Sequence, residues 1–231
     1  HTRRNFPVVG ASETPVHAKA RLIMPITAQL HRGISELGID LSPEAETRLC
    51  AYLTLIDKWN RVYNLTAVRT ENLMVVQHLL DSLAVIPHLG KVAMLADIGS
   101  GAGLPGIPLA IARPEMAVAL VESNQKKASF LQQAKIELKL DNVSIHCVRV
   151  EDFRTIGLFD VVISRAFSEL AEFVRLAGHL LASGGRLLAM KGVHPQAEIA
   201  QLPVGWHVMQ SIALAVPELD AQRHLIVIEK T

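Results

Sequence analysis

The chain has 231 residues, half of them hydrophobic, and its 23 Lys and Arg residues against 22 Asp and Glu residues give a formal net charge of +1 at pH 7. This length suits one α/β domain with a helical extension, and no apolar run reaches the ~18 uninterrupted residues that a membrane helix needs, so the composition predicts a soluble protein. With so little net charge, any contact with nucleic acid has to come from a local basic patch.

Residues 1–23 are predicted to be a leader or an appended arm. This segment lacks the apolar stretch of a secretion signal and shows no helical periodicity, and Met24 is the expected natural start. The leader is therefore kept out of the predicted fold.

The next segment, 24–90, is predicted to be an N-terminal helical extension. Apolar residues at helical spacing predict a first helix over 26–37, with a glycine placed to end it. A second helix is expected over 43–64, because a serine N-cap and a proline at the first helical position mark its start. A third helix is expected to begin near Thr70, to carry an apolar stripe of Leu73, Val76, Leu80 and Leu83, and to stop before Pro87.

From residue 91 to the C-terminus, short apolar runs alternate with helical patterns. Fully apolar strands in such an alternation are typical of a parallel sheet that is covered on both faces. The last two apolar runs, joined by a polar turn, predict an antiparallel pair of strands. The predicted strands lie within 92–99, 116–123, 143–150, 159–166, 184–192, 206–216 and 224–230, and the predicted helices within 104–113, 124–140 and 170–181. The predicted fold class is α/β, with a doubly wound and mostly parallel sheet of seven strands.

The stretch LADIGSGAGLPG, residues 95–106, follows the first predicted strand and is rich in glycine. It contains a GxGxxG pattern formed by Gly101, Gly103 and Gly106, and Glu122 closes the next strand about twenty residues later. Both features are typical of nucleotide-binding α/β folds, although the glycine pattern alone is a weak signal.

The residues around this turn favour S-adenosylmethionine (SAM) over NAD. Asp97 stands at the carboxyl end of the first strand and is predicted to point toward the crevice, where it would repel a pyrophosphate but attract the ammonium and sulfonium charges of SAM. Pro105 removes an N–H at the point where a pyrophosphate would need one. Glu122 is predicted to accept hydrogen bonds from two ribose hydroxyls.

The third predicted strand ends in Val150, Glu151 and Asp152, at the same edge of the sheet. Backbone N–H groups or a carboxylate there could read the adenine of SAM, and an ordinary polar loop is an equally good interpretation.

No residue is predicted to act as a nucleophile or a general base. The chain has no PP or PC dipeptide, whereas amino-group methyltransferases of nucleic acids carry a D/N-P-P-Y/F motif and cytosine-C5 enzymes carry a cysteine after a proline. Guanine N7 is an exposed lone pair without a proton, so its methylation needs positioning and electrostatics rather than a base. Arg165, after the fourth strand, is the one catalytic candidate: it could hold the base, the cofactor or a phosphate, or pair with Asp97 or Glu151.

Five further cations are candidates for RNA phosphates. Lys191 ends the fifth predicted strand, where a lysine more often meets a phosphate than the core, and Arg223 lies in the final turn, which could equally be solvated. Lys58, Arg61 and Arg69 cluster at one helix end, although a solvated charged face is the default interpretation. The nearby aromatic side chains are expected to pack against helices rather than to stack on bases.

The two cysteines, Cys50 and Cys147, are predicted to be buried free thiols in a reducing cytoplasm. They are far apart, form no CxxC motif and lie inside apolar patterns. The ten histidines form no HxH or HExxH motif, so no metal is expected.

Six blocks of sequence carry a resemblance to a known family. They are KWNRVYNLTAV (58–68), HLLDSL (78–83), DIGSGAGLPGIPLA (97–110), ISRAF (163–167), MKG (190–192) and QRHL (222–225). Together they make the chain similar to the bacterial ribosomal small-subunit methyltransferase G family, also called the glucose-inhibited division protein B family. The likeness runs from about residue 26 to the C-terminus.

This resemblance implies a class I SAM-dependent methyltransferase that methylates N7 of one guanine, guanine 527, in 16S rRNA. The implied partner is 16S rRNA or the small ribosomal subunit, and the implied enzyme is a cytoplasmic monomer without a metal or a membrane segment. The cofactor contacts that carry over are Gly99, Leu104, Val150, Glu151 and Arg165.

The resemblance also places Asn64 and His78 beside the cofactor mouth, as candidates for RNA contact. Two departures from the family pattern are mild: Ala102 stands where several relatives have Pro, and Glu122 stands where relatives often have Asp. Two alternatives to the methyltransferase remain open from the sequence, a non-catalytic SAM-binding assembly factor and an NAD-dependent oxidoreductase.

Overall fold

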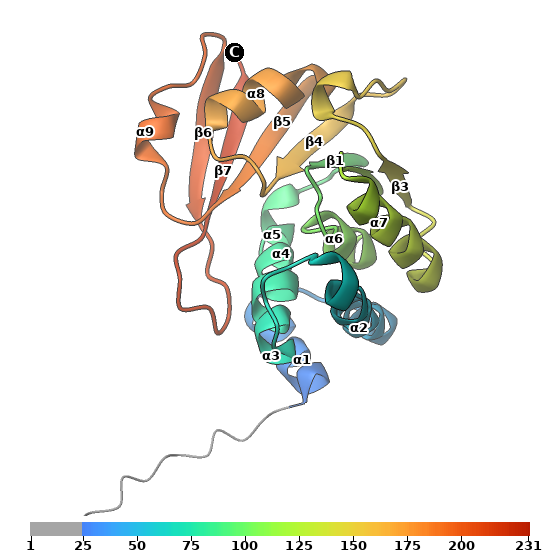
Figure 1. Cartoon of the computed structure of the whole chain (residues 1–231). Helices are drawn as coiled ribbons and strands as arrows, with labels where there is room; N and C mark the ends of the chain where they lie inside the picture. Colours follow the sequence, from blue (N-terminus) through green and yellow to red (C-terminus); the bar gives the residue numbers. More distant parts are fainter. Residues whose placement is uncertain (1–24) are drawn as a thin grey trace, which may run out of the picture.

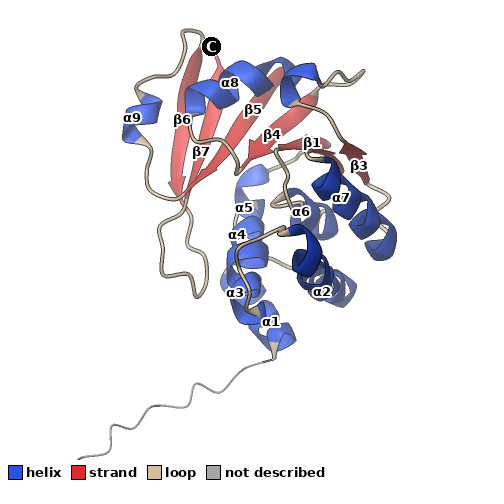
Figure 2. Cartoon of the chain, viewed as in Figure 1, coloured by secondary structure: helices blue, strands red, loops and turns tan. Residues whose placement is uncertain are grey.

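The computed structural model describes residues 25–231, so the predicted leader at 1–23 and the predicted start at Met24 lie outside the described residues. The described residues form a seven-stranded sheet with helices on both faces (Figure 1, Figure 2). The α/β class expected from the alternating pattern is confirmed.

Within residues 25–231, six helical segments precede the sheet. They are α1 (Ile26–Glu36), α2 (Pro43–Tyr63), α3 (Glu71–Met74), the π-helical turn η1 (Val75–Leu80), α4 (Asp81–Leu83) and α5 (Ile86–Leu89). The first two match the predicted helices. The Ser42 side chain accepts a hydrogen bond from the Ala45 N–H at 3.2 Å at the start of α2, and Asn64 ends it in the left-handed conformation.

The third predicted helix begins after Thr70 and ends before Pro87, as expected, but its α-helical geometry is not continuous. A π-helical turn separates α3 from α4, and Leu73, a member of the predicted apolar stripe, is 49% exposed. A π turn inserts an extra residue and rotates the helix faces before and after it relative to each other, so Leu80 is buried while Leu73, at α-helical spacing from it, is not. Pro87 itself lies in a further short helix, α5. It is tolerated there because, near the start of a helix, its missing N–H costs no hydrogen bond.

The sheet has the strand order β3-β2-β1-β4-β5-β7-β6. Its strands are β1 (Met94–Ile98), β2 (Ala117–Val121), β3 (Val143–His146), β4 (Phe159–Ser164), β5 (Leu181–Lys191), β6 (Trp206–Ala213) and β7 (His224–Lys230). Strands β1 to β5 pair in parallel, whereas β7 pairs antiparallel with both β5 and β6, as predicted. The order reverses between β1 and β4, and in such sheets ligands bind at the carboxyl ends of the strands beside this reversal.

Each face of the sheet has its own apolar core. On one face α6 (Gly106–Ala112) and α7 (Gln125–Leu138) pack together with α1 and α2 in one continuous cluster, and on the other face α8 (Leu170–Ala177) covers the sheet. Three shorter segments complete the chain: η2 (Val150–Asp152), η3 (Gly178–Leu180) and α9 (Gln196–Ile199). Because the N-terminal helices share the core of the sheet, the proposed boundary between residues 90 and 91 stays a prediction.

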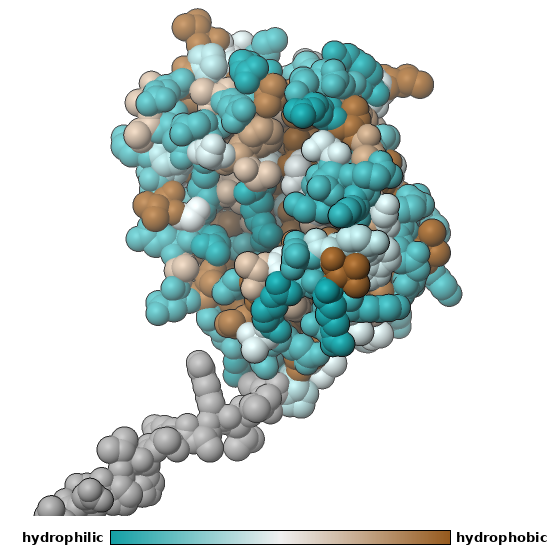
Figure 3. All heavy atoms as spheres, in the orientation of Figure 1, coloured by the Kyte–Doolittle hydropathy of each residue, from teal (hydrophilic) through white to brown (hydrophobic). Residues whose placement is uncertain are grey.

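The surface carries no large apolar region on the face that Figure 3 shows, where hydrophobic residues are scattered among hydrophilic ones. No helix within residues 25–231 is long and apolar enough to cross a membrane. Cys50 is half-buried and Cys147 is exposed, so the prediction of two buried thiols is wrong. β3 ends at His146, which leaves Cys147 in the following loop.

Candidate active site

The turn between β1 and α6 presents bare backbone at the carboxyl edge of the sheet. Gly99, Gly101 and Gly103 have φ values of 68°, 58° and 90°, which residues other than glycine rarely adopt. A Cβ atom at Gly101 would have no neighbour closer than the Gly99 carbonyl oxygen at 3.9 Å, so the backbone faces open space there. A ligand can therefore lie directly against this turn.

Glu122 holds the turn from the neighbouring strand. Its carboxylate is only 7% exposed, and its two oxygens accept hydrogen bonds from the N–H groups of Gly101 and Asn124, each at 2.8 Å. A carboxylate oxygen can accept a second hydrogen bond, so the predicted contact with ribose hydroxyls remains a prediction.

Asp97 lies beneath the turn rather than open to the crevice, which corrects the predicted orientation. Its side chain is fully buried, and its Oδ2 accepts a hydrogen bond from the Gly106 N–H at 2.8 Å. Pro105 has no N–H, so Gly106 supplies the first donor of α6, and Asp97 occupies it. This helix start therefore offers no free donor for a pyrophosphate at Gly106.

The second oxygen of Asp97 is left without a partner. Among the described residues, no group donates a hydrogen bond to its Oδ1, although the atom is buried. Burial raises the pKa of Asp97 to about 7, an effect that the Gly106 N–H and the positive charge of Arg165 reduce. A positive charge nearby would therefore stabilise the ionised form of this carboxylate.

Tyr52 supports the turn from below, and it is not among the residues predicted for the site. The residue lies on α2 and is fully buried, and its hydroxyl donates a hydrogen bond to the Ala102 carbonyl oxygen. Its ring stacks on the ring of Phe130 in α7, with 6.5 Å between the two ring centroids. A tyrosine among the apolar residues of a buried helix face needs a partner for its hydroxyl, and this requirement is the signal that could have found it.

We expect Tyr52→Phe to lower the free energy of unfolding by about 1–2 kcal/mol, because it leaves the buried Ala102 carbonyl without a donor. Chemical denaturation measures this loss. Tyr63→Phe is the matched control, since the Tyr63 side chain is exposed and its loss should cost nearly nothing. Equal losses in the two variants would contradict a supporting role for Tyr52.

Arg165 pairs with an acid that is not one of its predicted partners. Its Nη1 donates to Asp81 Oδ2 at 3.1 Å and to the Gln77 carbonyl oxygen at 3.2 Å, and not to the predicted partners Asp97 or Glu151. Arg223 Nε donates to the other oxygen of the same Asp81 at 2.9 Å. A charged residue on a helix face among leucines signals a buried ion pair, and HLLDSL shows this pattern.

Lys191 is a structural cross-link rather than a free cation, which corrects the predicted phosphate contact. Its Nζ donates to the carbonyl oxygens of Phe167 and Ser168 at 3.1 and 2.7 Å and pairs with Glu198 at 2.6 Å. These three contacts use all three donors of an ammonium group. The side chain ties the loop after β4 to the end of β5.

His78 is buried in the π-helical turn, which corrects its predicted exposure to RNA. It is 4% exposed, and its Nε2 lies 2.9 Å from Thr66 Oγ1. Burial and the positive charge of Arg165 lower its pKa to about 4, so the ring is neutral at pH 7. Its Nδ1 has no hydrogen-bond partner among the described residues.

The C-terminal end of α2 keeps its predicted candidates at the surface. Lys58, Arg61, Asn64 and Arg69 are all exposed. Arg61 pairs with Asp57 at 2.8 Å, and Arg69 donates to Asn64 Oδ1 at 3.3 Å. The neighbouring aromatic Trp59 packs edge-on against Phe130 at 5.7 Å, as expected of a packing residue.

The residues proposed to read the adenine are placed differently from their prediction. β3 ends at His146, and Val150 and Glu151 lie beyond it in the 3-10 helix η2 rather than at the end of a strand. Val150 is half-buried, and Glu151 is exposed. Leu104, the remaining predicted contact in the glycine turn, is buried. Their contact with SAM stays a prediction.

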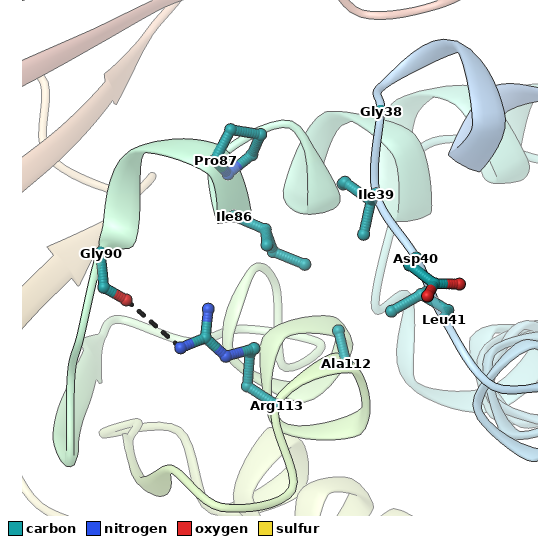
Figure 4. A pocket seen from close by; sticks show the side chains of 9 residues that line it. All are labelled: Gly38, Ile39, Asp40, Leu41, Ile86, Pro87, Gly90, Ala112 and Arg113. Atoms are coloured by element: carbon teal, nitrogen blue, oxygen red, sulfur yellow. Dashed lines mark hydrogen bonds between the residues drawn. The ribbon is translucent and has the colours of Figure 1, made fainter.

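A cavity of about 400 Å³ lies away from this edge, between the loop before α2, α5 and the end of α6 (Figure 4). Arg113, the cation in its wall, already donates to the Gly90 carbonyl oxygen at 3.2 Å and pairs with Glu115. The nine lining residues include none of the predicted site residues. The glycine turn is therefore the better candidate for the cofactor site.

Comparisons with known proteins agree on one family. The family model described as rRNA small subunit methyltransferase G (GidB) matches residues 45–226. The ribosomal RNA small subunit methyltransferase G of Aromatoleum aromaticum is 56% identical over 207 residues, which cover 88% of this chain and 98% of that protein. The protein of the same name from Neisseria meningitidis serogroup C is 51% identical over 202 residues, covering 87% and 97%.

Two solved structures show the same fold at low sequence identity. The mitomycin 7-O-methyltransferase MmcR is similar with a TM-score of 0.57 at 16% identity, covering 89% of this chain and 67% of that one. TrmN from Thermus thermophilus is similar with a TM-score of 0.53 at 17% identity, and the match covers 65% of this chain and 48% of that one. The predicted fold, the Rossmann-like sheet of class I SAM-dependent methyltransferases, is confirmed.

Proposed function

The chain belongs to the rRNA small subunit methyltransferase G family, and from that premise we propose that it transfers a methyl group from SAM to N7 of one guanine in 16S rRNA. Family membership carries this proposal, and the carboxyl edge of the sheet supports it. The oxidoreductase and the non-catalytic assembly factor that the sequence left open give way to a methyltransferase.

The residues at this edge fit SAM. Gly101 faces open space, and the buried Asp97 has one oxygen without a donor, next to a turn that offers no free N–H at Gly106. When bound, SAM supplies the methyl group as an electrophile on a positively charged sulfur. A partly charged, desolvated carboxylate close to the turn favours such a cation through its electrostatic attraction.

The chain has to position the acceptor rather than deprotonate it. Guanine N7 carries a lone pair and no proton, so an in-line displacement at the methyl carbon needs no general base. His78, with its pKa of about 4, is neutral, and its Nε2 is held by Thr66. Alignment of the base and exclusion of water are the tasks left to the site, and Arg165 is its candidate catalytic residue.

Two groups of residues divide the binding work in this proposal. Those expected to contact SAM are Gly99, Leu104, Val150, Glu151 and Arg165, with Asp97, Gly101 and Glu122 shaping the turn. Lys58, Arg61, Asn64 and Arg69 form an exposed cluster suited to RNA phosphates. We further propose guanine 527 as the methylated base, a monomer as the active form, and the cytoplasm, where small subunits lie, as its location.

Transfer of labelled methyl groups tests the proposal. We expect 16S rRNA or small subunits from a strain that lacks this activity to accept label from methyl-labelled SAM, with strand scission at one guanine after borohydride and aniline. Small subunits from a strain with the activity are the matched control and should accept little label. Label found only in protein or in small molecules would overturn the proposal.

The same assay identifies the substrate when it is run on graded particles. Naked 16S rRNA, an assembly intermediate and the complete small subunit each present the target guanine in a different surrounding. The particle with the highest kcat/KM is the physiological substrate.

A further inference from the structure

Asp81 joins two arginines that come from distant parts of the chain. Its carboxylate is 3% exposed, Oδ2 accepts from Arg165 Nη1 at 3.1 Å, and Oδ1 accepts from Arg223 Nε at 2.9 Å. Asp81 opens α4, Arg165 follows β4, and Arg223 precedes β7. One buried side chain of the N-terminal helices therefore fixes two cations at the carboxyl edge of the sheet.

The π-helical turn η1 delivers Asp81 to this place. The turn ends at Leu80, so the extra residue that it inserts sets the direction of the side chain that follows. The turn also presents the Gln77 carbonyl oxygen, which accepts a second hydrogen bond from Arg165 Nη1 at 3.2 Å. Helix geometry and charge thus act together on one guanidinium group.

The two arginines lie over different parts of the edge. Arg165 follows the end of β4 and lies beside the glycine turn. The distance shows this: a Cβ atom at Gly99 would come within 2.8 Å of the Cβ atom of Ala166, the residue after Arg165. The guanidinium of Arg223 lies about 4.0 Å from the position of a Cβ atom at Gly192, just past the end of β5. β4 and β5 are neighbouring strands, so Asp81 connects an arginine beside the glycine turn with an arginine beside the end of β5.

The three side chains together carry a net charge of +1 and keep donors in reserve. Asp81 neutralises one of the two arginines, while 29% of the Arg165 side chain and 25% of the Arg223 side chain are exposed. Among residues 25–231, Nε and Nη2 of Arg165 and Nη2 of Arg223 have no hydrogen-bond partner. A guanidinium group with free, exposed N–H groups is well suited to an anionic ligand.

We propose that Asp81 is a positioning residue of the methyl-transfer site, which aligns Arg165 for the α-carboxylate of SAM and Arg223 for a phosphate of the RNA. The half that concerns Arg223 rests on the proposed function. Asp81 touches neither ligand in this proposal and acts through the two guanidinium groups. Its loss leaves two partly buried cations without their shared counter-ion, so each becomes free to turn away from its ligand.

A double-mutant cycle on SAM affinity tests the first half. We expect Asp81→Asn to weaken SAM binding about fivefold to tenfold, as measured by calorimetry, but by less than twofold when Arg165→Ala is already present. Glu115→Gln is the matched control, because it removes a carboxylate from an arginine pair outside the site and should leave SAM affinity unchanged. An unchanged SAM affinity for Asp81→Asn, or equal losses in both backgrounds, would overturn the proposal.

Kinetics with the RNA substrate test the second half. We expect Arg223→Gln to raise the KM for RNA while SAM affinity stays within twofold of the wild type, and Asp81→Asn to alter both quantities. An RNA KM that Asp81→Asn leaves unchanged would overturn this half. A wild-type protein that binds SAM but methylates no RNA would contradict the proposed function instead, while the SAM cycle would still judge the role of Asp81 toward Arg165.

Thermal unfolding of each variant shows whether the fold is intact. Should Asp81→Asn fail to fold, Asp81→Glu carries the cycle, because it keeps the charge and moves the carboxylate by one methylene. We then expect a smaller loss of SAM affinity that again disappears with Arg165→Ala. A loss that persists in that background would overturn the proposal.

Discussion

Asp97→Asn is expected to weaken SAM binding tenfold or more at pH 8, a loss of at least ~1.4 kcal/mol of binding free energy. The substitution keeps the size of the side chain and an oxygen to accept from the Gly106 N–H, but it removes the negative charge. Because Asp97 is fully buried, water screens this charge weakly, and its attraction for the cationic cofactor is correspondingly strong. Calorimetry with SAM measures the loss.

The pH dependence of SAM binding separates charge from shape. Asp97, with its pKa of about 7, is mostly protonated at pH 6 and mostly ionised at pH 8. The ratio of the wild-type to the Asp97→Asn association constant should therefore rise between pH 6 and pH 8 and stay level above it. Taking this ratio cancels the titration of SAM itself. A ratio that does not change with pH would remove the charge of Asp97 from the explanation.

Stability should depend on pH in the opposite sense. The folded-state pKa of about 7 lies above the ordinary value of 3.8, so between these values the folded state binds the extra proton. Ionisation of this buried group then costs stability as pH rises through that window, and the cost is fully present above the folded pKa. Asp97→Asn should accordingly gain stability relative to the wild type from pH 5 to pH 8, while it loses SAM affinity.

Apolar periodicity was sufficient to predict the sheet. The inner strands β1, β2, β4 and β7 are largely buried and are continuous apolar runs set off by turn residues or a helix, so their positions along the chain follow from local sequence. The third helix resisted prediction because α and π turns share the same apolar composition. They differ in how the helix faces on either side are aligned, as the exposed Leu73 before the turn and the buried Leu80 at its end show, and tertiary packing decides that choice.

Side-chain partners at the site could be predicted only where they are close in sequence or held by strand register. The approach of Glu122 to the glycine turn follows from the pairing of β1 with β2. The partners of Lys191 and His78, which are Glu198 and Thr66, lie on separate segments that meet only in the folded chain, so the sequence does not show that these two side chains are engaged. The sequence around a lysine or an arginine does not show which acid it pairs with in the folded chain.

Asp81 illustrates the reverse case, in which the acid is visible but its partners are not. A carboxylate between Leu80 and Leu83 requires compensation once the helix is buried, because an unpaired buried charge is strongly unfavourable. The sequence contains many arginines that could serve. Only the meeting of α4 with the ends of β4 and β7 selects Arg165 and Arg223.

Gly106→Ala is expected to lower the free energy of unfolding by about 3 kcal/mol, and to weaken SAM binding with it. A Cβ atom at this position would lie 2.3 Å from Leu120 Cδ2 and 2.7 Å from Asp97 Oδ2. Leu120 is fully buried in β2, and Asp97 is held by its hydrogen bond to the Gly106 N–H, so neither has room to withdraw. Chemical denaturation measures the change in stability.

Gly192→Ala is the matched control for this prediction, since a Cβ atom there would meet nothing closer than about 4.0 Å, and its cost should stay within about 0.5 kcal/mol. Comparable losses at the two positions would indicate a general intolerance of alanine rather than a clash beneath the turn. A loss confined to Gly106→Ala would tie the glycine to the carboxylate below it. The last glycine of the GxGxxG pattern is then required by the packing of Asp97 and β2 against the start of α6, whereas the bare backbone that can meet a ligand is that of Gly101.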